Sequence, residues 1–139
     1  MVLTIGMTNT AELTVTENFT AKAAKSGSLP VYATPFMIAL MEEASAGLIE
    51  PYLDDGITSV GTMINIQHLA ATAVGATVKA TSTLTSFDGR KFCFAVEVYD
   101  NAGLIGKGTL VRFSVKSDKF MAKCQERAKI NEEVRLCFI

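Results

Sequence analysis

Three side chains of this sequence could together carry out acid–base chemistry at a carbonyl group. His68 is the single histidine of the chain, and Thr34 and Glu42 lie eight residues apart in a segment with helical periodicity. An imidazole and a carboxylate can act as general acid and base near neutral pH. A threonine at the start of a helix places its hydroxyl where a carbonyl oxygen that gains negative charge is stabilised.

Each of these residues also has an ordinary structural explanation. A histidine on an apolar strand face is commonly a core residue that hydrogen-bonds to the backbone. Glu42 could reach solvent from the border of an apolar face, and Thr34 could simply cap its helix. The residue types make the trio plausible without selecting it. The sequence contains no G-x-S-x-G motif, phosphate loop or dinucleotide fingerprint that would indicate another chemistry.

The helix that would carry Thr34 and Glu42 is the clearest element of the sequence. We expect it to begin with Thr34 as N-cap and Pro35 in the first turn, and to end near Glu50. At about 100° per residue, its apolar stripe consists of Met37, Ile38, Met41, Ala44, Leu48 and Ile49. Glu43 falls opposite this stripe, whereas Glu42 lies at its border.

Strands with alternating patterns are expected before and after this helix in the sequence. A short strand is predicted at Glu12–Glu17, and longer ones at 60–68, 74–86, 92–98 and 104–115. Their predicted core residues are Val60, Thr62, Ile64, Ile66 and His68, then Val74, Ala76, Val78, Ala80 and Leu84, then Phe92, Phe94, Val96 and Val98, and finally Ile105, Val111, Phe113 and Val115. Gly106 and Gly108 lie on the other face of the last strand, where a backbone or ligand can approach closely.

The order of these elements predicts the fold class and the domain organisation. A chain of 139 residues is the size of one domain, here 1–139. One long helix and a meander of strands predict an α+β fold, in which a curved antiparallel sheet of about five strands wraps around one central helix. Hydrophobic residues make up 49% of the chain, so we expect a subunit that buries an apolar face or an edge strand against a second copy.

Charge and cysteine content argue against several kinds of partner. Thirteen basic and fourteen acidic residues give a net charge of −1, which argues against nucleic acid as the main partner. The longest uncharged run, Gly56–Val78, holds many polar side chains and is not expected to span a membrane. Cys93, Cys124 and Cys137 match no metal motif, so we expect free thiols, no metal site and a reducing cytoplasmic location without a signal peptide.

Three stretches of the chain resemble one known family. Val31–Ala44 resembles the helix signature of the fluoroacetyl-CoA-thioesterase-like family, which has the hotdog fold. Val60–Thr72 resembles its second signature, and Gly103–Arg112 resembles its last strand. The resemblance runs from about residue 7 to residue 123, which would form the core of a single hotdog domain. Residues 124–139 would then be a surface helix or a frayed tail.

The resemblance implies hydrolysis of the thioester bond of a small acyl-CoA by a homodimer, or by a dimer of two such dimers, without a metal or redox cofactor. The catalytic residues of the family correspond to Thr34, Glu42 and His68. Gly61 would lie against the acyl group, with Thr62 beside it in the substrate site. Glu42 would attack the carbonyl carbon or activate a water, and His68 would stabilise charge or assist the leaving thiolate.

Two segments of the chain depart from the pattern of the family. The lid segment Ala24–Pro30 carries Lys25 and Ser28 where the fluoroacetate-specific enzyme has aromatic residues, which predicts an open, polar entrance without strong preference for a fluoroacetyl group. The last strand has Leu110 and Val111 where many relatives have His-Glu.

The alternative function is a hotdog module that binds or senses acyl-CoA without turnover, and a hotdog dehydratase is a weaker option.

Coenzyme A carries several negative charges, and this chain has no overall positive charge to attract them. Local cations must therefore hold its phosphates. Arg90, Lys91, Lys107 and Arg112 lie near predicted strand ends and are candidates, although the sequence favours a solvated surface position for each of them.

Overall fold

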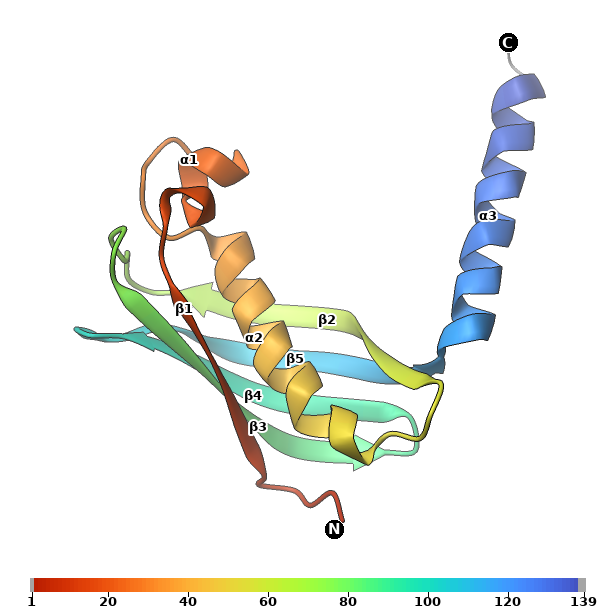
Figure 1. Ribbon diagram of the computed structural model, residues 1–139, viewed down its shortest axis with the longest axis horizontal. Coiled ribbons are helices and arrows are strands. Elements are labelled where there is room, and N and C mark those ends of the chain that lie inside the picture. Colours follow the sequence, from red (N-terminus) through yellow and green to blue (C-terminus); the bar gives the residue numbers. More distant parts are fainter. Residues whose placement is uncertain (1, 138–139) are drawn as a thin grey trace.

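A curved five-stranded antiparallel sheet lies against one long helix in the computed structural model (Figure 1), which describes residues 2–137 and the side chains of residues 2–129. The strands are β1 (Thr8–Thr14), β2 (Ile57–His68), β3 (Thr77–Asp88), β4 (Lys91–Asp100) and β5 (Gly103–Lys116), in the spatial order β1-β3-β4-β5-β2. The long helix is α2 (Thr34–Ile49). The predicted α+β class, with a curved sheet around one helix, is confirmed.

Helix α2 begins differently from the prediction. Ala33 is its N-cap and makes no side-chain capping bond, while Thr34 is already the first helical residue. The prediction of Thr34 as N-cap is therefore wrong. The helix ends at Ile49 and continues as a short 3₁₀ turn, η2 (Glu50–Tyr52). Its buried residues, which pack into the core, are Met37, Leu40, Met41, Ala44, Ser45, Leu48 and Ile49.

The chain before α2 forms a strand and two short helical turns. The first strand begins four residues earlier than the predicted Glu12 and ends at Thr14, because a backbone ladder with β3 needs no apolar side chains. The 3₁₀ turn η1 (Glu17–Phe19) and the short helix α1 (Ala21–Ala24) follow. The hydroxyl of Thr20 caps α1 by accepting a hydrogen bond from the Ala23 amide at 3.2 Å.

Strand β2 contains a β-bulge that changes which residues face α2. Its pairing with β5 shifts between Gly61 and Met63, so Thr62 is the extra residue. Gly61 faces α2 before the bulge, and His68 faces α2 after it. The prediction that Val60 and Thr62 share a face with His68 is wrong, because the bulge reverses the alternation between them.

The helix-facing side of β5 is also the reverse of the predicted one. Leu110, Arg112 and Ser114 are buried, whereas the residues predicted for the core, Val111, Phe113 and Val115, are half-buried. A second register shift, between Val98 and Tyr99, accommodates Ile105 as an extra residue, and Ile105 is buried as predicted. Gly106 lies under α2, where an added Cβ would come within 2.5 Å of the Met37 sulfur.

The two middle strands follow the predicted pattern more closely. Val78, Ala80 and Leu84 of β3 are buried, as are the predicted core residues of β4, which are Phe92, Phe94, Val96 and Val98. Val74 precedes β3 and is 42% exposed, so its predicted core position is wrong. Inside this core, the hydroxyl of Ser45 bonds to that of Ser82 at 2.7 Å, which attaches α2 to β3.

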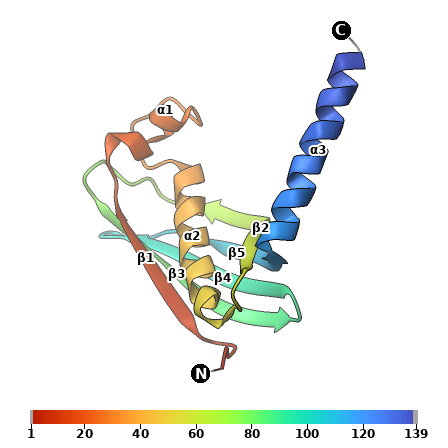
Figure 2. The ribbon, with the colours of Figure 1, turned by 45° about the vertical axis from the view of Figure 1, so that its right-hand side comes forward.

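Helix α2 covers one part of the sheet more closely than the rest. Helix α2 packs mainly over β1 and β3 and makes less contact with β2 and β5. Helix α3 (Ser117–Cys137) projects from the end of β5, at the opposite end of the sheet from α1 (Figures 1 and 2). No helix within residues 2–137 is both long and apolar enough to cross a membrane.

Candidate active site

Thr34 and His68 form a hydrogen-bonded pair where α2 begins and β2 ends. The Thr34 hydroxyl lies 2.7 Å from Nδ1 of His68. Nε2 of His68 is buried and has no hydrogen-bond partner among the described residues. Burial lowers the pKa of His68 below its ordinary value of 6.5, so the imidazole is neutral near pH 7. Burial outweighs an opposing contact of the ring with the Ala70 backbone, so the pair is an uncharged polar unit at the first turn of α2.

A cavity of about 360 Å³ adjoins this pair. Its lining includes Thr34 and His68 together with Ala21, Ser26, Val31, Tyr32, Leu69, Ala70 and Ala71. The Tyr32 ring meets the imidazole edge-on, with 6.5 Å between the ring centroids. Burial raises the pKa of Tyr32, so its phenol stays neutral and donates a hydrogen bond to the Phe36 carbonyl. These walls suit a small uncharged group.

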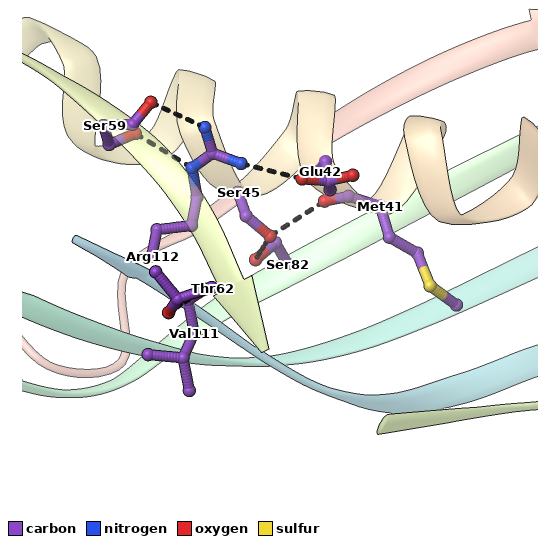
Figure 3. A network of polar contacts seen from close by, with 8 residues as sticks. All are labelled: Met41, Glu42, Ser45, Ser59, Thr62, Ser82, Val111 and Arg112. Carbon is purple, nitrogen blue, oxygen red and sulfur yellow. Dashed lines mark hydrogen bonds and ion pairs between the residues drawn. The ribbon is translucent and has the colours of Figure 1, made fainter. Parts of the chain in front are cut away.

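Glu42 belongs to a second cluster, two turns further along α2 (Figure 3). Its Oε2 accepts a hydrogen bond from NH1 of Arg112 at 3.1 Å, and the two form an ion pair. Arg112 also donates from Nε to the Ser59 hydroxyl and from NH2 to the Ser59 carbonyl, both at 2.9 Å. The guanidinium of Arg112, which belongs to β5, is thus fixed by Ser59 of β2 and in turn orients the Glu42 carboxylate.

Gly61 completes this second cluster. A Cβ at position 61 would lie 2.6 Å from Oε2 of Glu42, so any larger residue would displace the carboxylate. Thr62 lies with Val111 on the side away from Glu42, and its hydroxyl donates to the Val111 carbonyl at 3.3 Å (Figure 3). The structure therefore brings Gly61 to Glu42 and leaves Thr62 outside the cluster.

The two clusters lie apart along one side of the molecule. Eight helical residues separate Thr34 from Glu42, a rise of about 12 Å. Among the described side chains, no hydrogen bond joins Glu42 to Thr34 or His68. Glu43 is exposed and Glu42 is half-buried, which confirms the environments predicted from the helical phase. A substrate that uses all three residues must reach from one cluster to the other.

Arg112 is the residue of this second cluster whose environment the sequence pattern predicts wrongly. The sequence favours a solvated position for Arg112, which is wrong, because the residue is only 9% exposed and contacts Glu42 of α2. The alternation of Val111, Phe113 and Val115 placed those residues in the core and Arg112 outside. The signal that could have corrected this phase is Gly106 and Gly108, which share a face with Arg112 and mark close approach of other backbone or side chains.

The side chains of this region do not form a recognisable set of metal ligands among the described residues. Within the residues that the structure describes, there is no group of three or more His, Cys, Asp or Glu side chains placed to hold a metal ion. The polar groups at hand are a hydroxyl, a neutral imidazole, a carboxylate and a guanidinium. Together they can polarise a carbonyl, move a proton and stabilise an oxyanion.

Comparison of the sequence with known proteins identifies the family to which the chain belongs. Residues 15–118 match the family described as fluoroacetyl-CoA-specific thioesterase. A fluoroacetyl-CoA thioesterase from Streptantibioticus cattleyicolor is 41% identical over 97 residues, which are 70% of each chain.

Solved structures agree with this assignment. A structure of the fluoroacetyl-CoA thioesterase FlK superposes with a TM-score of 0.87 and 33% identity, covering 91% of this chain and 98% of that one. FlK has also been solved, in a mutant form, with fluoroacetate and CoA. A thioesterase superfamily member from Thermus thermophilus gives a TM-score of 0.87 at 28% identity, over 95% of this chain and 98% of the other. This chain belongs to the fluoroacetyl-CoA-specific thioesterase family and is a thioester hydrolase with the hotdog fold.

Proposed function

We propose that this chain hydrolyses the thioester of a short acyl-CoA, with Thr34, Glu42 and His68 as its catalytic residues. The observation that carries the proposal is the 2.7 Å contact between Thr34 and His68 beside a small cavity, with Nε2 of the imidazole buried and unpartnered among the described residues. A buried polar atom without a partner costs free energy unless a ligand satisfies it. The family to which the chain belongs supplies the reaction type.

In this proposal the thioester carbonyl lies between the Thr34–His68 pair and the Glu42 carboxylate, on the side of α2 that carries both clusters. Glu42 either attacks the carbonyl carbon or removes a proton from a water that attacks it. The tetrahedral intermediate then collapses, the C–S bond breaks, and the coenzyme A thiolate leaves and takes up a proton. When water is the nucleophile, this step releases the acid directly. When Glu42 is the nucleophile, the acyl group remains on its carboxylate as a mixed anhydride, and a water hydrolyses this anhydride to release the acid and restore Glu42. His68 stabilises the developing charge or assists the leaving thiolate. None of these steps needs a metal or redox cofactor.

The test is release of free thiol from a panel of short acyl-CoAs, measured on the native chain. Hydrolysis that is saturable in the acyl-CoA is the expected result. Binding of acyl-CoA without thiol release would instead support the alternative of a module that binds or senses these molecules. The unpartnered imidazole nitrogen favours the enzyme, because a sensor does not need a polar atom held ready for the reacting group.

The acyl group is proposed to be small, without strong selection for fluorine. Ser26 of the lid segment lines the cavity, while Lys25 and Ser28 are exposed and neither is aromatic. We expect fluoroacetyl-CoA and acetyl-CoA to differ by less than about tenfold in kcat/KM, which corresponds to about 1.4 kcal/mol. Competition between the two substrates in one reaction measures this ratio directly, and a larger preference for the fluorinated substrate would contradict the expectation.

A homodimer is proposed as the working unit, formed through β2. This strand is 12 residues long and lies at the edge of the sheet, and Met63 on it is 62% exposed. Long exposed edges favour pairing with another strand. Sedimentation should show a species of twice 14.9 kDa, and a fourfold species would indicate that two dimers associate. A 14.9 kDa species alone at micromolar concentration would rule out the dimer.

A reducing compartment such as the cytoplasm is the proposed location. Cys93 and Cys124 are free thiols, and Cys124 is exposed, which suits a compartment where thiols stay reduced. The side chain of Cys137 lies outside the described residues. Fractionation of the source cells, with detection of the native chain, would test this location.

A further inference from the structure

The loop between β2 and β3, residues 69–76, supplies one wall of the cavity beside the Thr34–His68 pair. The wall segment is the part of this loop that lines the cavity directly after His68, and it consists of Leu69, Ala70 and Ala71. The next residue, Thr72, is only 2% exposed, although its neighbours on both sides are exposed. A buried polar residue in an otherwise exposed loop needs a specific partner, so the contacts of Thr72 show what holds the wall segment.

Thr72 connects the loop to two other parts of the chain. Its hydroxyl donates a hydrogen bond to Oδ2 of Asp100 at 2.8 Å. Its carbonyl accepts a hydrogen bond from the amide of Tyr32 at 2.9 Å. Tyr32 is buried, meets the imidazole edge-on and lies two residues before the first residue of α2. Thr72 therefore joins the end of β4 to the segment that leads into α2.

The carboxylate of Asp100 uses both of its oxygens. Oδ1 accepts hydrogen bonds from the amides of Ala102 and Gly103 at 2.8 and 3.2 Å, which fixes the turn into β5. Oδ2 accepts the bond from Thr72, and this bond is the main reason that the pKa of the Asp100 carboxyl lies below its ordinary value of 3.8. The group is therefore ionised near neutral pH. Hydrogen bonds to an ionised acceptor are stronger than those between neutral groups, so the attachment of Thr72 is firm.

The start of the wall segment is attached to the same hairpin. The carbonyl of Ile105, the residue inserted into β5, accepts hydrogen bonds from the amides of Leu69 and Ala70 at 2.7 and 3.3 Å. The β4–β5 hairpin thus holds the wall segment from both ends. The first attachment is made by the backbone, and the second is made by the side chains of Thr72 and Asp100. Of the two attachments, the second is the one that a substitution removes cleanly.

We propose that Thr72 and Asp100 are positioning residues of the thioesterase reaction, which hold the wall segment in place beside His68. Neither side chain contacts the reacting atoms in this assignment. The wall segment limits the space for the acyl group and keeps the thioester carbonyl aligned with the imidazole. The assignment rests on the proposed function, because it concerns how the same cavity holds the same acyl group.

The kinetic test removes the Thr72 hydroxyl while keeping the shape of the side chain. We expect Thr72→Val to lower kcat for acetyl-CoA by about fivefold and to change KM by less than about twofold, because alignment in the cavity is impaired and binding of the rest of the substrate is not. Thr72→Ser keeps the hydroxyl and should keep most of the native kcat. The matched control is Thr85→Val, which removes an exposed hydroxyl that bonds to the Cys93 carbonyl outside the cavity. A native kcat in Thr72→Val, or a serine variant as slow as the valine variant, would overturn the proposal.

A second variant tests whether the two residues act as one unit. Asp100→Ala should lower kcat as much as Thr72→Val, and the double variant should be no slower than the slower single variant, since each change removes the same bond. Losses that multiply in the double variant would mean independent structural damage and would overturn the proposal. Asp88→Ala, at an exposed position at the end of β3, is the control. Thermal unfolding must show that each variant is folded, and Asp100→Asn, which keeps an acceptor for the turn amides, replaces an alanine variant that does not fold.

A measurement without substrate separates this proposal from the proposed function. The single histidine gives an isolated NMR ring signal, and a displaced wall segment should change its chemical shift. We expect a clear change in Thr72→Val and in Asp100→Ala, and a much smaller one in Thr72→Ser and Thr85→Val. If no acyl-CoA is hydrolysed but this pattern holds, the proposed function fails and the positioning of the wall segment stands. If the native chain releases thiol but Thr72→Val changes neither kcat nor the ring signal, the positioning role fails and the thioesterase stands.

Discussion

The two halves of the candidate active site hold their polar groups in different ways. The Thr34–His68 pair is uncharged, and one nitrogen of its imidazole is buried without a partner among the described residues. The carboxylate of Glu42, in contrast, is held by Arg112, which is itself held by two bonds to Ser59. One half is prepared to accept a ligand, and the other is prepared to keep a charged group in position.

The largest effect is expected when the charged half loses its carboxylate. Glu42→Gln keeps the side-chain shape but removes the proton acceptor or nucleophile, so kcat should fall by about 10²-fold or more. Glu43→Gln is the matched control, because Glu43 is exposed on the next position of the same helix. Steady-state thiol release measures both.

The Glu42→Gln variant leaves the Arg112 guanidinium without its carboxylate, so thermal unfolding must show that the protein is folded before its kcat is interpreted. Equal activity of the two glutamine variants would contradict the role of Glu42. Loss of activity in Glu43→Gln alone would move the catalytic position by one residue.

The uncharged half should be nearly as sensitive. His68→Ala is expected to lower kcat by about 10²-fold, since it removes the nitrogen that would contact the reacting group. Thr34→Ala should also lower kcat, but without loss of a helix cap, because the N-cap is Ala33 and the Thr34 hydroxyl bonds to His68. Thr34→Ser retains that hydroxyl and should retain most activity. A serine variant as inactive as the alanine variant would show that the methyl group, and not the hydroxyl, is required.

A smaller effect is expected when the orientation of Glu42 is loosened while the charges are kept. Arg112→Lys preserves the positive charge but cannot reproduce the fork that contacts both Glu42 and Ser59. We expect kcat to fall by about tenfold with little change in KM, because positioning and not binding is impaired. Arg127→Lys, on the exposed surface of α3, is the control. An unchanged kcat in Arg112→Lys would show that charge alone suffices.

The smallest expected effect is a shift in one titration. His68 is the single histidine, so its ring protons give an isolated NMR signal, and burial should place its midpoint below pH 6.5. The unfolded chain then binds more protons than the folded chain between the lowered pKa and 6.5. The free energy of unfolding should therefore rise with pH across that window, and this contribution is lost as the pH falls through it. A midpoint above 6.5 would mean that a negative charge lies beside the ring.

Sequence periodicity predicted the helix and the middle of the sheet well, since α2, β3 and β4 each bury an apolar face. It placed Glu42 and Glu43 correctly for the same reason. It failed at the edges of the regular pattern, where Thr62 and Ile105 are inserted into β2 and β5 and reverse the alternation. The environment of Arg112 could not be predicted from hydrophobicity. The face of β5 that lies toward α2 carries Arg112, Ser114 and glycines, whereas the opposite face of this strand carries valines and a phenylalanine.

The bulge at Thr62 has a consequence for how this sequence can change. Gly61 and His68 are seven positions apart, an odd number, so in a regular strand they would point to opposite faces. The one inserted residue restores the parity and turns both toward α2, which is how the two halves of the site come to share a side. Substitutions at position 62 preserve this count, whereas loss of a single residue from 62–67 changes it. Gene lineages of this protein should therefore tolerate replacement in this stretch far better than deletion, and its length should be inherited more strictly than its composition.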